Sequence, residues 1–304
     1  MPDDTLVIVN PAGGGGRALR AEAIVANYLA ARGRSVRMIR SRSSEDIREQ
    51  AARGAASGYR YVVALGGDGA FHHLIEGIGG TEAVAGFFPA GSGNDMAYAL
   101  GIPADPVRAA EAFLRSQPRS VDLIRASFSG GRIAHFVCAG GLGLDAEAAH
   151  LANTRFRAWP GTARYLAGAL ATFSRRRPFG IHAELDETTW AGRAIFVAIA
   201  NASSYGSGVR IAPEARMDDG WLNAVLVGEL TWRRLLEAVP IVLGSGDLRF
   251  EEVKRYRCKR VAIKTDRPAL VHGDGELLGQ SPVEFEILPG AVRIMMPRAH
   301  QSSS

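Results

Sequence analysis

The sequence predicts an α/β domain built on a parallel sheet, followed by a second domain of mainly antiparallel strands. Strand-like and helix-like segments alternate up to about Val121, which is typical of a parallel sheet with helices on both faces. Beyond that point strand follows strand with few helices between them, which indicates a β-sandwich. We therefore divide the chain into residues 1–122 and 123–289, with 290–298 as a candidate return to the first domain and 299–304 as a disordered tail.

The alternation in the first domain rests on apolar runs and on the residues that end them. Short runs rich in Val, Ile and Leu predict buried strands. The segment from Arg17 carries Leu and Ala at helical spacing and stops at Gly33. The predicted strands are 6–9, 36–39, 61–65 and 83–88, and the predicted helices are 17–32 and one that opens with capping residues at 44–46.

The second domain is predicted from successive apolar runs that turn residues separate. Because few helices lie between these runs, neighbouring strands are expected to pair antiparallel. The predicted strands are 132–139, 181–186, 194–201, 222–227, 261–265, 283–288 and 292–296, and the predicted helices are 161–173 and 231–243.

Composition and charge narrow the class of protein. With 47% hydrophobic and 22% charged residues, the chain has ample material for a globular core. Its formal charge of +5 suits an anionic partner such as a nucleotide or an anionic bilayer, and suits a mildly basic solvated surface equally well. A nucleic-acid binder is disfavoured, because the arginines are scattered and no recognition motif is present.

The cysteines and the apolar segments favour a cytoplasmic protein. Cys138 and Cys258 lack metal-type spacing, so we expect a reducing compartment and no disulfide framework. We find no signal-peptide pattern at the start and no apolar stretch near the roughly 20 residues that cross a bilayer. A protein of this kind with a lipid substrate is expected to work peripherally, at the inner face of the membrane.

Three glycine-rich loops carry the chemistry. The segment 66–69, Gly-Gly-Asp-Gly, follows a predicted strand, and the segments 10–16 and 88–95 hold the same position after the first and fourth strands. Backbone N–H groups of such loops form phosphate sites, and parallel sheets bind ligands at the carboxyl ends of their strands. Each loop alone is also explained by a tight turn. Three of them at one edge of a sheet favour a phosphate-bearing ligand.

These loops are followed by further motifs in a fixed order. They are Gly-Leu-Gly-Leu-Asp-Ala at 141–146, an Ala-Pro-Glu-Ala to Asp-Asp-Gly-Trp-Leu segment at 212–222, and Gly-Asp-Gly-Glu at 273–276. The ordered set resembles the diacylglycerol kinase catalytic family, which includes bacterial lipid kinases and sphingosine kinases. The resemblance implies an NAD-kinase/diacylglycerol-kinase-like fold with the active site in the cleft between the domains. It also implies ATP- and Mg²⁺-dependent transfer of the γ-phosphoryl group to a hydroxyl of a lipid such as diacylglycerol.

The resemblance assigns a nucleotide site to this chain. Ser41 and Ser92 stand where the family often has threonine, so the hydroxyl groups are kept. The residues that the resemblance places around the nucleotide are Asn10, Pro11, Ala12, Gly13, Gly14, Ser41, Gly66, Gly67, Asp68, Gly69, Ala70, Phe71, His72, His73, Gly91, Ser92, Asn94 and Asp95.

Four carboxylates receive roles from the same resemblance. Asp274 is implied as the general base that takes the proton of the acceptor hydroxyl, with Glu276 beside it, and Asp68 as a group that holds the phosphate-bound Mg²⁺. A positioned carboxylate and Mg²⁺ on oxygen ligands suit phosphoryl transfer. Taken alone, Gly-Asp-Gly at 273–275 is also ordinary hairpin chemistry. A structural Mg²⁺ site is implied at the Asp219 carboxylate and the main-chain carbonyls of Arg216 and Trp221.

The chain departs from the family pattern just after the Gly-Gly-Asp-Gly loop. Ala70 stands where the family usually has threonine, His73 where glutamate is common, and His72 and Glu76 where asparagine is common. These changes could alter metal binding, mark a different acceptor or lower the rate. Adjacent histidines suggest a metal, but side chains at i and i+1 of a helix diverge. We therefore expect one histidine in the site and one at the surface.

Arginines and aromatic residues flank the predicted helix 161–173. The segment 155–160 and the arginines at 175–177 could meet an anionic bilayer at its interface. A core-packed helix with a solvated basic end explains them equally well.

Two other functions stay open beside the lipid kinase. An NAD-kinase-like enzyme also uses Gly-Gly-Asp-Gly, although the Asn-Pro-glycine loop and the motif at 273–276 argue against it. Ala70 and His73 motivate a nonenzymatic lipid- or nucleotide-binding protein, against which the retained acidic residues argue. The sequence does not name the acceptor, the preferred nucleoside triphosphate or the oligomeric state, for which a homodimer is one option.

Overall fold

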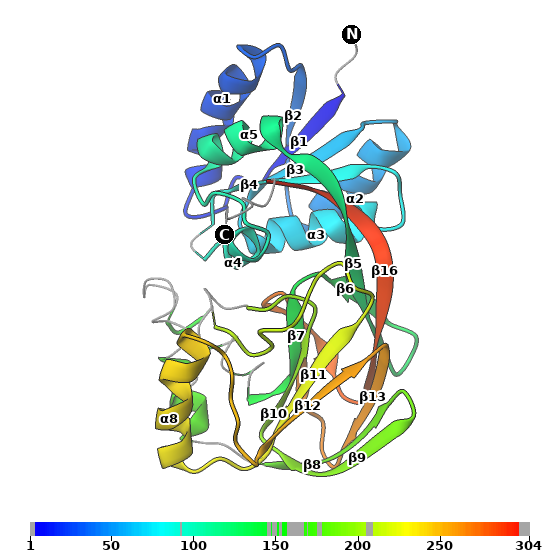
Figure 1. Cartoon of the computed structure of the whole chain (residues 1–304). Coiled ribbons are helices and arrows are strands. Elements are labelled where there is room, and N and C mark those ends of the chain that lie inside the picture. Colours follow the sequence, from blue (N-terminus) through cyan, green and yellow to red (C-terminus); the bar gives the residue numbers. More distant parts are fainter. Residues whose placement is uncertain are drawn as a thin grey trace, which may run out of the picture. The chain divides into compact units, whose positions relative to one another are not determined.

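The computed structural model divides the chain into two compact units (Figure 1). Unit 1 comprises Met1–Val121 with Gly290–Ser304, and unit 2 comprises Asp122–Pro289. The chain passes between the units within strand β5 (Gln117–Phe128) and within strand β16 (Val283–Met296). The residues whose structure is described are 4–91, 93–144, 147, 151, 154–156, 167–168, 170–174, 178–204 and 209–297.

Unit 1 is built on a parallel sheet. Its strands lie in the order β2-β1-β3-β4, and the last part of β16 pairs parallel with β4. Every residue of β1, β3 and β4 is buried, because helices cover both faces of the sheet. The bounds are β1 (Thr5–Val9), β2 (Val36–Arg40), β3 (Tyr61–Gly66) and β4 (Val84–Pro89).

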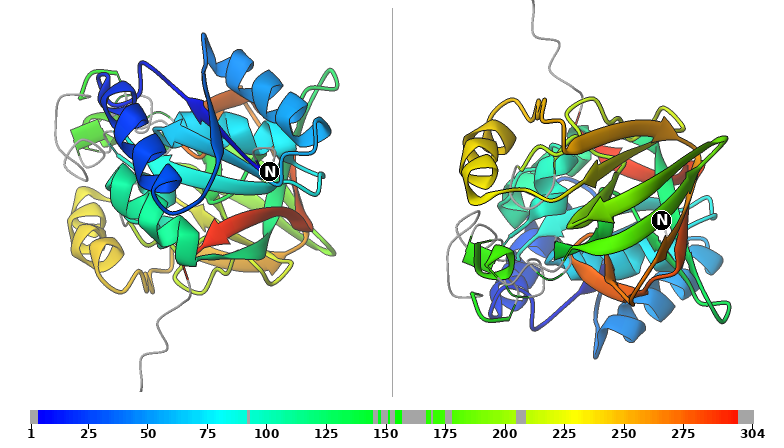
Figure 2. Two further views of the ribbon diagram at one scale, coloured as in Figure 1. Left: turned by 90° about the horizontal axis from the view of Figure 1, so that it is seen from above. Right: turned by 90° about the horizontal axis from the view of Figure 1, so that it is seen from below.

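Helices connect these strands and cover the sheet. Helix α1 packs against α5, and α2 packs against α3, and Figure 2 shows the two pairs on opposite sides of the strands. Right-handed crossovers produce this arrangement, because the chain moves from β1 to β2 in one direction and from β2 through β3 to β4 in the other. The helices are α1 (Arg17–Ala30), α2 (Ser44–Ala56), α3 (Asp68–Ile78), α4 (Asp95–Ala99) and α5 (Pro106–Arg115).

The carboxyl ends of β1, β3 and β4 lie along one edge of the sheet, because these strands are adjacent and parallel. Each of them ends in one of the glycine-rich loops, which we call loop 1 (residues 10–16), loop 2 (67–69) and loop 3 (90–94). The strand order reverses between β1 and β3, and open parallel sheets bind ligands at such a switch point. The topology therefore gathers the three loops where a ligand site is expected.

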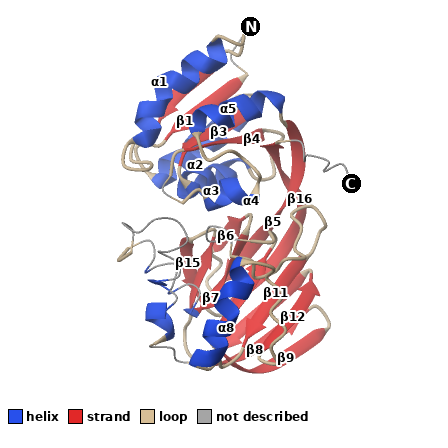
Figure 3. Cartoon of the chain, turned by 60° about the vertical axis from the view of Figure 1, so that its left-hand side comes forward, coloured by secondary structure: helices blue, strands red, loops and turns tan. Residues whose placement is uncertain are grey.

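Unit 2 is an antiparallel β-sandwich, and Figure 3 shows that strands make up most of it. One sheet has the order β12-β11-β10-β7-β14-β15, and the other contains β16, β13, β8 and β9 with β5 and β6. Apolar side chains of both sheets form one core, which contains Leu142 and Val197 of the first sheet and Val261 and Phe285 of the second. Unit 2 comprises β6 (Ile133–Phe136), β7 (Ala139–Gly143), β8 (Phe179–Leu185), β9 (Thr188–Ala194), β10 (Phe196–Ala200), β11 (Leu222–Val227), β12 (Val253–Cys258), β13 (Arg260–Thr265), β14 (Leu270–Gly273), β15 (Glu276–Gln280) and helix α8 (Trp232–Leu243).

The predicted fold class is confirmed, while some element boundaries were wrong. The predicted strand 132–139 is two strands, β6 and β7, and the predicted strands 283–288 and 292–296 are one, since β16 continues through Pro289 and Gly290. Strands β5, β9, β12, β14 and β15 were not predicted. Helix α2 is capped by Ser43, whose hydroxyl accepts the Asp46 N–H at 3.1 Å.

Some sequence predictions fall on residues outside the described ranges. These are Ser92, the motif end at 145–146, the tail at 299–304, and most of the segment 155–177 that was considered for bilayer contact. Within the described part of the chain, no helix has both the length and the apolar character that a membrane crossing requires.

Candidate active site

Loops 1 and 3 are each joined to the end of β3, from which loop 2 begins, by a backbone hydrogen bond. The Asn10 N–H donates to the Leu65 carbonyl at 2.9 Å, and the Ala90 N–H donates to the Gly66 carbonyl at 2.6 Å. These bonds prolong the pairing of β1, β3 and β4 by one residue into the loops. The clustering that the sequence predicts is therefore present in the structure.

Two glycines allow this close approach. Gly14 has φ +58°, and a Cβ there would lie 1.9 Å from the Ala90 carbonyl oxygen, so loop 1 touches loop 3. A Cβ on Gly91 would lie 2.7 Å from the Gly67 Cα, so loop 3 touches loop 2. Any side chain at either position would push the loops apart. Gly15, by contrast, has open space where its Cβ would be, so the backbone of loop 1 is accessible there.

Asp68 connects loop 2 to the helix that follows loop 3. Its carboxylate accepts the N–H groups of Asp95 at 3.1 Å and of Met96 at 3.0 Å, the first amides of α4. An acidic side chain at a helix N-terminus satisfies donors that have no partner within the helix. Asp68 therefore has a structural role in addition to the role that the resemblance implies.

Asn94 closes loop 3 on itself. Its side-chain carbonyl accepts the Gly91 N–H at 2.9 Å, and its backbone adopts the left-handed conformation, with φ 59° and ψ 40°. Asparagine tolerates this conformation better than most residues. Asp95 follows it and begins α4. The loop geometry thus depends on an asparagine whose role the sequence pattern did not specify.

Arg17 is a functional candidate that the sequence interpretation missed. Its guanidinium donates to the Gly14 carbonyl at 3.3 Å and also to the Gly91 carbonyl, so one cation spans loops 1 and 3. A guanidinium at this edge is suited to an anionic phosphate. Its position directly after the four glycines of loop 1 was the available signal.

The remaining predicted nucleotide-site residues differ in exposure. Asn10, Pro11, Gly67 and Gly69 are half-buried, Ala12 is exposed, and Gly13 and Gly66 are buried. The Ser41 hydroxyl is buried and donates to the Val9 carbonyl at 3.2 Å. Ala70 and Phe71 are buried in α3, where the Phe71 ring stacks on Phe87 with centroids 4.6 Å apart. These contacts hold Ser41, Ala70 and Phe71 within the packing of unit 1.

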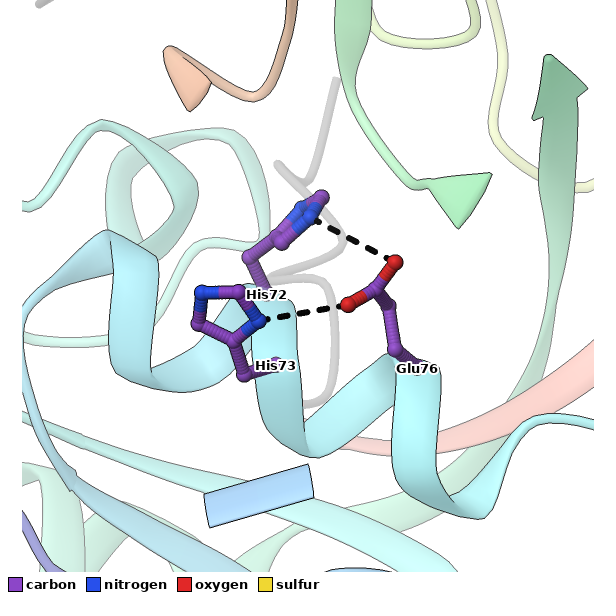
Figure 4. A group of neighbouring side chains, drawn as sticks. All are labelled: His72, His73 and Glu76. Atoms are coloured by element: carbon purple, nitrogen blue, oxygen red, sulfur yellow. Dashed lines mark hydrogen bonds and ion pairs between the residues drawn. The ribbon is translucent and has the colours of Figure 1, made fainter. Parts of the chain in front are cut away.

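The prediction that the two adjacent histidine side chains diverge was wrong, because both rings lie beside Glu76. His72 is buried and His73 is partly exposed, and both rings approach Glu76 (Figure 4). Burial alone would raise the pKa of Glu76, but the hydrogen bond with His73 and the positive charges of His72, His73 and Arg48 outweigh burial and lower it. Glu76 is therefore an anion at neutral pH.

In unit 2, Asp274 lies in the turn between β14 and β15. It has φ 51°, which an aspartate in a turn tolerates. Its carboxylate accepts three backbone N–H groups, from Val137 and Cys138 at 2.8 Å each and from Ala139 at 3.3 Å. These donors lie at the junction of β6 and β7. These three hydrogen bonds fix the carboxylate in position.

Glu276 differs from its neighbour in the same hairpin. It begins β15 and is exposed, whereas Asp274 is half-buried. The hairpin therefore carries two carboxylates two residues apart, of which Asp274 is fixed by hydrogen bonds and Glu276 is exposed.

The loop at residues 216–221 is organised by two aspartates. The Asp219 carboxylate accepts the Trp221 N–H at 3.1 Å and pairs with the Arg257 guanidinium at 2.8 Å. The buried Asp122 accepts the Gly220 N–H at 2.7 Å. Arg216 is exposed, and its guanidinium lies 3.4 Å from the Asp218 carboxylate.

Asn201 joins this loop to the Asp274 turn and was also missed. The side chain is fully buried, and its amide donates to the carbonyls of Asp122 at 2.9 Å and Val137 at 2.8 Å. Val137 in turn donates to Asp274. The available signals were a charged residue inside the apolar run at 121–124 and an asparagine at the end of the predicted strand 194–201.

The donor atoms fit Mg²⁺ in kind, and the phosphate loops fit a nucleotide. Oxygen ligands are those that Mg²⁺ prefers, and the candidate donors at Asp68, Asp219, Arg216 and Trp221 are all oxygens. Both oxygens of Asp68 and of Asp219 already accept hydrogen bonds. A bound ion would therefore share each carboxylate with these partners.

The fold and the site together define a phosphotransferase of the kinase class, with a nucleotide-type parallel-sheet domain and a β-sandwich. Residues 4–126 match the family model of the diacylglycerol kinase catalytic domain, and residues 139–296 match that of the YegS C-terminal NAD kinase beta sandwich-like domain.

Relatives of known name cover nearly the whole chain. A diacylglycerol kinase of Mycobacterium tuberculosis is 31% identical over 295 residues, which cover 96% of this chain and 94% of the relative. The Pseudomonas aeruginosa PAO1 protein named "Probable lipid kinase YegS-like" is 29% identical over 299 residues and 97% and 95% of the two chains. The crystal structure of a diacylglycerol kinase from Bacillus anthracis str. Sterne superposes with a TM-score of 0.77 at 20% identity, covering 98% of each chain, and so supports the fold. The chain belongs to the diacylglycerol kinase family of YegS-like lipid kinases.

Proposed function

We propose that this protein transfers the γ-phosphoryl group of ATP, with Mg²⁺, to a hydroxyl of a lipid such as diacylglycerol. The observation that carries the proposal is the mutual contact of three glycine-rich loops at the carboxyl edge of the parallel sheet. Their backbone N–H groups, with the nearby Arg17 guanidinium, suit the phosphates of a nucleotide. Family membership supplies the lipid class of the acceptor.

On the donor side, the residues of unit 1 bind and orient. Loops 1 and 3 would cradle the phosphates, and Arg17 would neutralise part of their charge. Asp68 would hold the start of α4 in place and share its carboxylate with the metal. Mg²⁺ on the phosphate oxygens would offset charge that develops during transfer.

On the acceptor side, Asp274 would take the proton of the attacking hydroxyl. Three N–H donors hold its carboxylate in one orientation, which is what a general base requires. Glu276 would orient Asp274 or the acceptor from its exposed position. Asp219, with the carbonyls of Arg216 and Trp221, would bind a structural Mg²⁺ that stiffens the loop at 216–221.

An enzyme that acts on a lipid must contact the membrane surface. Helix α8 carries exposed apolar side chains that suit such contact. Trp232, Leu236 and Leu243 expose 44%, 64% and 44% of their surface and recur at spacings of four and seven on one helix face. Such a face suits shallow insertion at a bilayer interface. We expect peripheral binding to anionic vesicles that Leu236→Asp weakens, measured by cosedimentation.

The nucleotide site is tested by separating the loops. In Gly91→Ala, the new Cβ meets the Gly67 backbone at 2.7 Å, so loops 2 and 3 must move apart. We expect ATP affinity, measured by calorimetry, to fall sharply. Gly228→Ala is the matched control, because its Cβ would stay 3.3 Å from the nearest atom. Equal ATP affinity in both variants would contradict the assignment of these loops to the nucleotide.

The reaction is tested with γ-labelled ATP and a total lipid extract, with and without Mg²⁺. We expect Mg²⁺-dependent label in a lipid product. NAD⁺ is offered as acceptor in a parallel reaction, because the second domain matches a model described as NAD kinase-like. Label in NAD⁺ rather than lipid would favour the NAD-kinase alternative. ATP binding with no labelled acceptor would favour a nonenzymatic binding protein.

A further inference from the structure

Helix α3 carries three side chains of metal-binding type that converge on one point (Figure 4). The Nδ1 atom of His73 lies 3.2 Å from one Glu76 oxygen, and the Nε2 atom of His72 lies 4.0 Å from the other. The donor atoms of His72, His73 and Glu76 all lie within 4.8 Å of one another. Among the described residues, this is the single group of three His, Cys, Asp or Glu side chains that meets such a criterion.

Helix geometry explains how adjacent histidines reach the same acceptor. Glu76 is four residues after His72 and three after His73, and both spacings bring side chains together on a helix surface. Glu76 can therefore be reached by His72 from one turn before it and by His73 from the neighbouring position. The two rings are nearly perpendicular, at 84°, with centroids 5.2 Å apart. Each ring can therefore direct a nitrogen toward the carboxylate without stacking on the other.

The separations suit one bound ion after small movements. With bonds of about 2.1 Å to nitrogen or oxygen, two ligands of a tetrahedral ion lie about 3.4 Å apart. The N···O separations are 3.2 Å for His73 and 4.0 Å for His72, each to a different Glu76 oxygen, and with one donor atom from each residue all three lie within 4.8 Å of one another. His73 and Glu76, with exposed side-chain fractions of 21% and 16%, have room to adjust, while the buried His72 is the fixed member.

The chemistry of the three side chains suits a metal ion. A metal site uses neutral imidazole nitrogens and a carboxylate oxygen as ligands, so binding of the ion displaces any protons that these atoms carry. From α2, the charged groups that act on the cluster are Glu45, which interacts with His73, and Arg48, which interacts with Glu76.

We propose that His72, His73 and Glu76 bind a divalent transition-metal ion of the zinc type. Two imidazole nitrogens and one carboxylate oxygen select zinc, cobalt or nickel rather than Mg²⁺, which prefers oxygen donors alone. Three protein ligands leave a fourth position for water or another ligand. None of these three residues is among the Mg²⁺ ligands considered above.

The position of the cluster on α3 means that a bound ion would stabilise this helix. His72 is four residues after Asp68, which belongs to loop 2 and is the first residue of α3. A metal that ties together positions 72, 73 and 76 would clamp the middle of this helix and stabilise unit 1. Binding alone tests the site, so the proposal does not depend on the lipid-kinase assignment.

The experiment uses the full chain without a polyhistidine tag, freed of metal with a chelator. Co²⁺ is titrated and its visible absorption recorded, since a site with nitrogen ligands and low coordination number gives intense bands. Zn²⁺ affinity is measured by competition with a chromogenic chelator, and melting temperature is recorded with and without Zn²⁺. We expect one equivalent to bind at micromolar or tighter affinity and to raise the melting temperature.

Variants locate the site and guard against misfolding. His73→Ala and Glu76→Gln change partly exposed positions and should lower affinity by at least about tenfold to a hundredfold, the range that even second-sphere changes cause. A combined His72→Asn/His73→Glu/Glu76→Asn variant introduces residues common at these positions in the family and should remove the Co²⁺ bands. His182→Ala is the matched control, because His182 also lies beside a carboxylate, Glu184 at 3.8 Å, on a strand of unit 2.

Each outcome decides the proposal. Loss of binding in the α3 variants with retention in His182→Ala supports it. Wild-type protein that binds neither Co²⁺ nor Zn²⁺ at micromolar concentration overturns it. Binding that persists unchanged in folded Glu76→Gln and in the combined variant places the ion elsewhere and overturns it as well.

Discussion

Replacing Asp274 by asparagine is the most informative single change in unit 2. The substitution keeps the shape of the side chain but exchanges one carboxylate oxygen for an N–H₂ donor and removes the charge. In the structure, one oxygen accepts the Val137 N–H at 2.8 Å, and the other accepts Cys138 at 2.8 Å and Ala139 at 3.3 Å. Whichever way the amide is turned, at least one backbone N–H then faces a donor.

The structure therefore predicts two separate effects. A lost hydrogen bond to a charged group costs about 1.5–3 kcal/mol, so we expect the free energy of unfolding to fall by about 2–3 kcal/mol. If Asp274 is the general base, turnover should fall by about a hundredfold to ten-thousandfold, the usual contribution of such a group. ATP affinity should change little, because Asp274 has no role in the proposed donor site.

Asp186→Asn separates the two effects. Asp186 also has a positive φ, of 48°, in a hairpin turn of unit 2, and its carboxylate accepts the Lys259 and Arg260 N–H groups at 2.9–3.1 Å. The same exchange there should cost similar stability and leave turnover unchanged. Glu276→Gln, at an exposed position, should reduce turnover only mildly.

The assay combines urea unfolding, ATP calorimetry and initial rates with γ-labelled ATP and diacylglycerol in mixed micelles, all well below the melting temperature. A folded Asp274→Asn protein with near-normal turnover would refute the base assignment and direct attention to Asp68 or Glu276. A loss of turnover equal to that in Asp186→Asn would make Asp274 structural only. Lost ATP binding would place it in the donor site.

Asp68→Asn should abolish kinase turnover and lower the free energy of unfolding by about 1–2 kcal/mol, because the cap of α4 is weakened. Rate measurements and chemical unfolding check the two effects. Unchanged turnover would show that Asp68 does not hold the metal. Asp219→Ala removes the contact with Arg257 and should lower the melting temperature and weaken its response to Mg²⁺. A melting curve identical to that of the wild-type protein at every Mg²⁺ concentration would exclude a structural ion there. Burial, with the negative charge of Asp186, raises the pKa of Cys258 to about 12, so the thiol stays protonated and should resist alkylation near pH 9 until the protein unfolds. Mass spectrometry of the alkylated protein would reveal any native-state labelling of Cys258, which would contradict this burial.

Local patterns carried most of the fold prediction. The runs at 6–9 and 61–65 are apolar throughout, and the glycines after them mark the loops, so strand positions and the loop cluster could be inferred from short stretches. Pro289 and Gly290 are read as a break in any local pattern, yet β16 passes through them. Pairing along the rest of the strand overrides the local preference there.

Long-range contacts in the candidate site were not predictable in this way. Asn201 bonds to carbonyls 79 and 64 residues away, and Asp68 reaches amides 27 and 28 residues away. No spacing rule connects such positions. The histidine pair was mispredicted for a local reason. The rule for neighbours at i and i+1 considered only the two histidines and left out Glu76, which both side chains reach.

Phosphoryl transfer to a lipid can be followed through the fate of two labels. The wild-type protein is incubated with diacylglycerol micelles, Mg²⁺ and ATP labelled in either the γ- or the α-phosphate, and the lipid is extracted and chromatographed. We expect phosphatidic acid that carries the γ label, no lipid that carries the α label, and no product when Mg²⁺ is chelated. ATP that binds but yields no labelled lipid, or a lipid that carries the α label, would contradict this expectation.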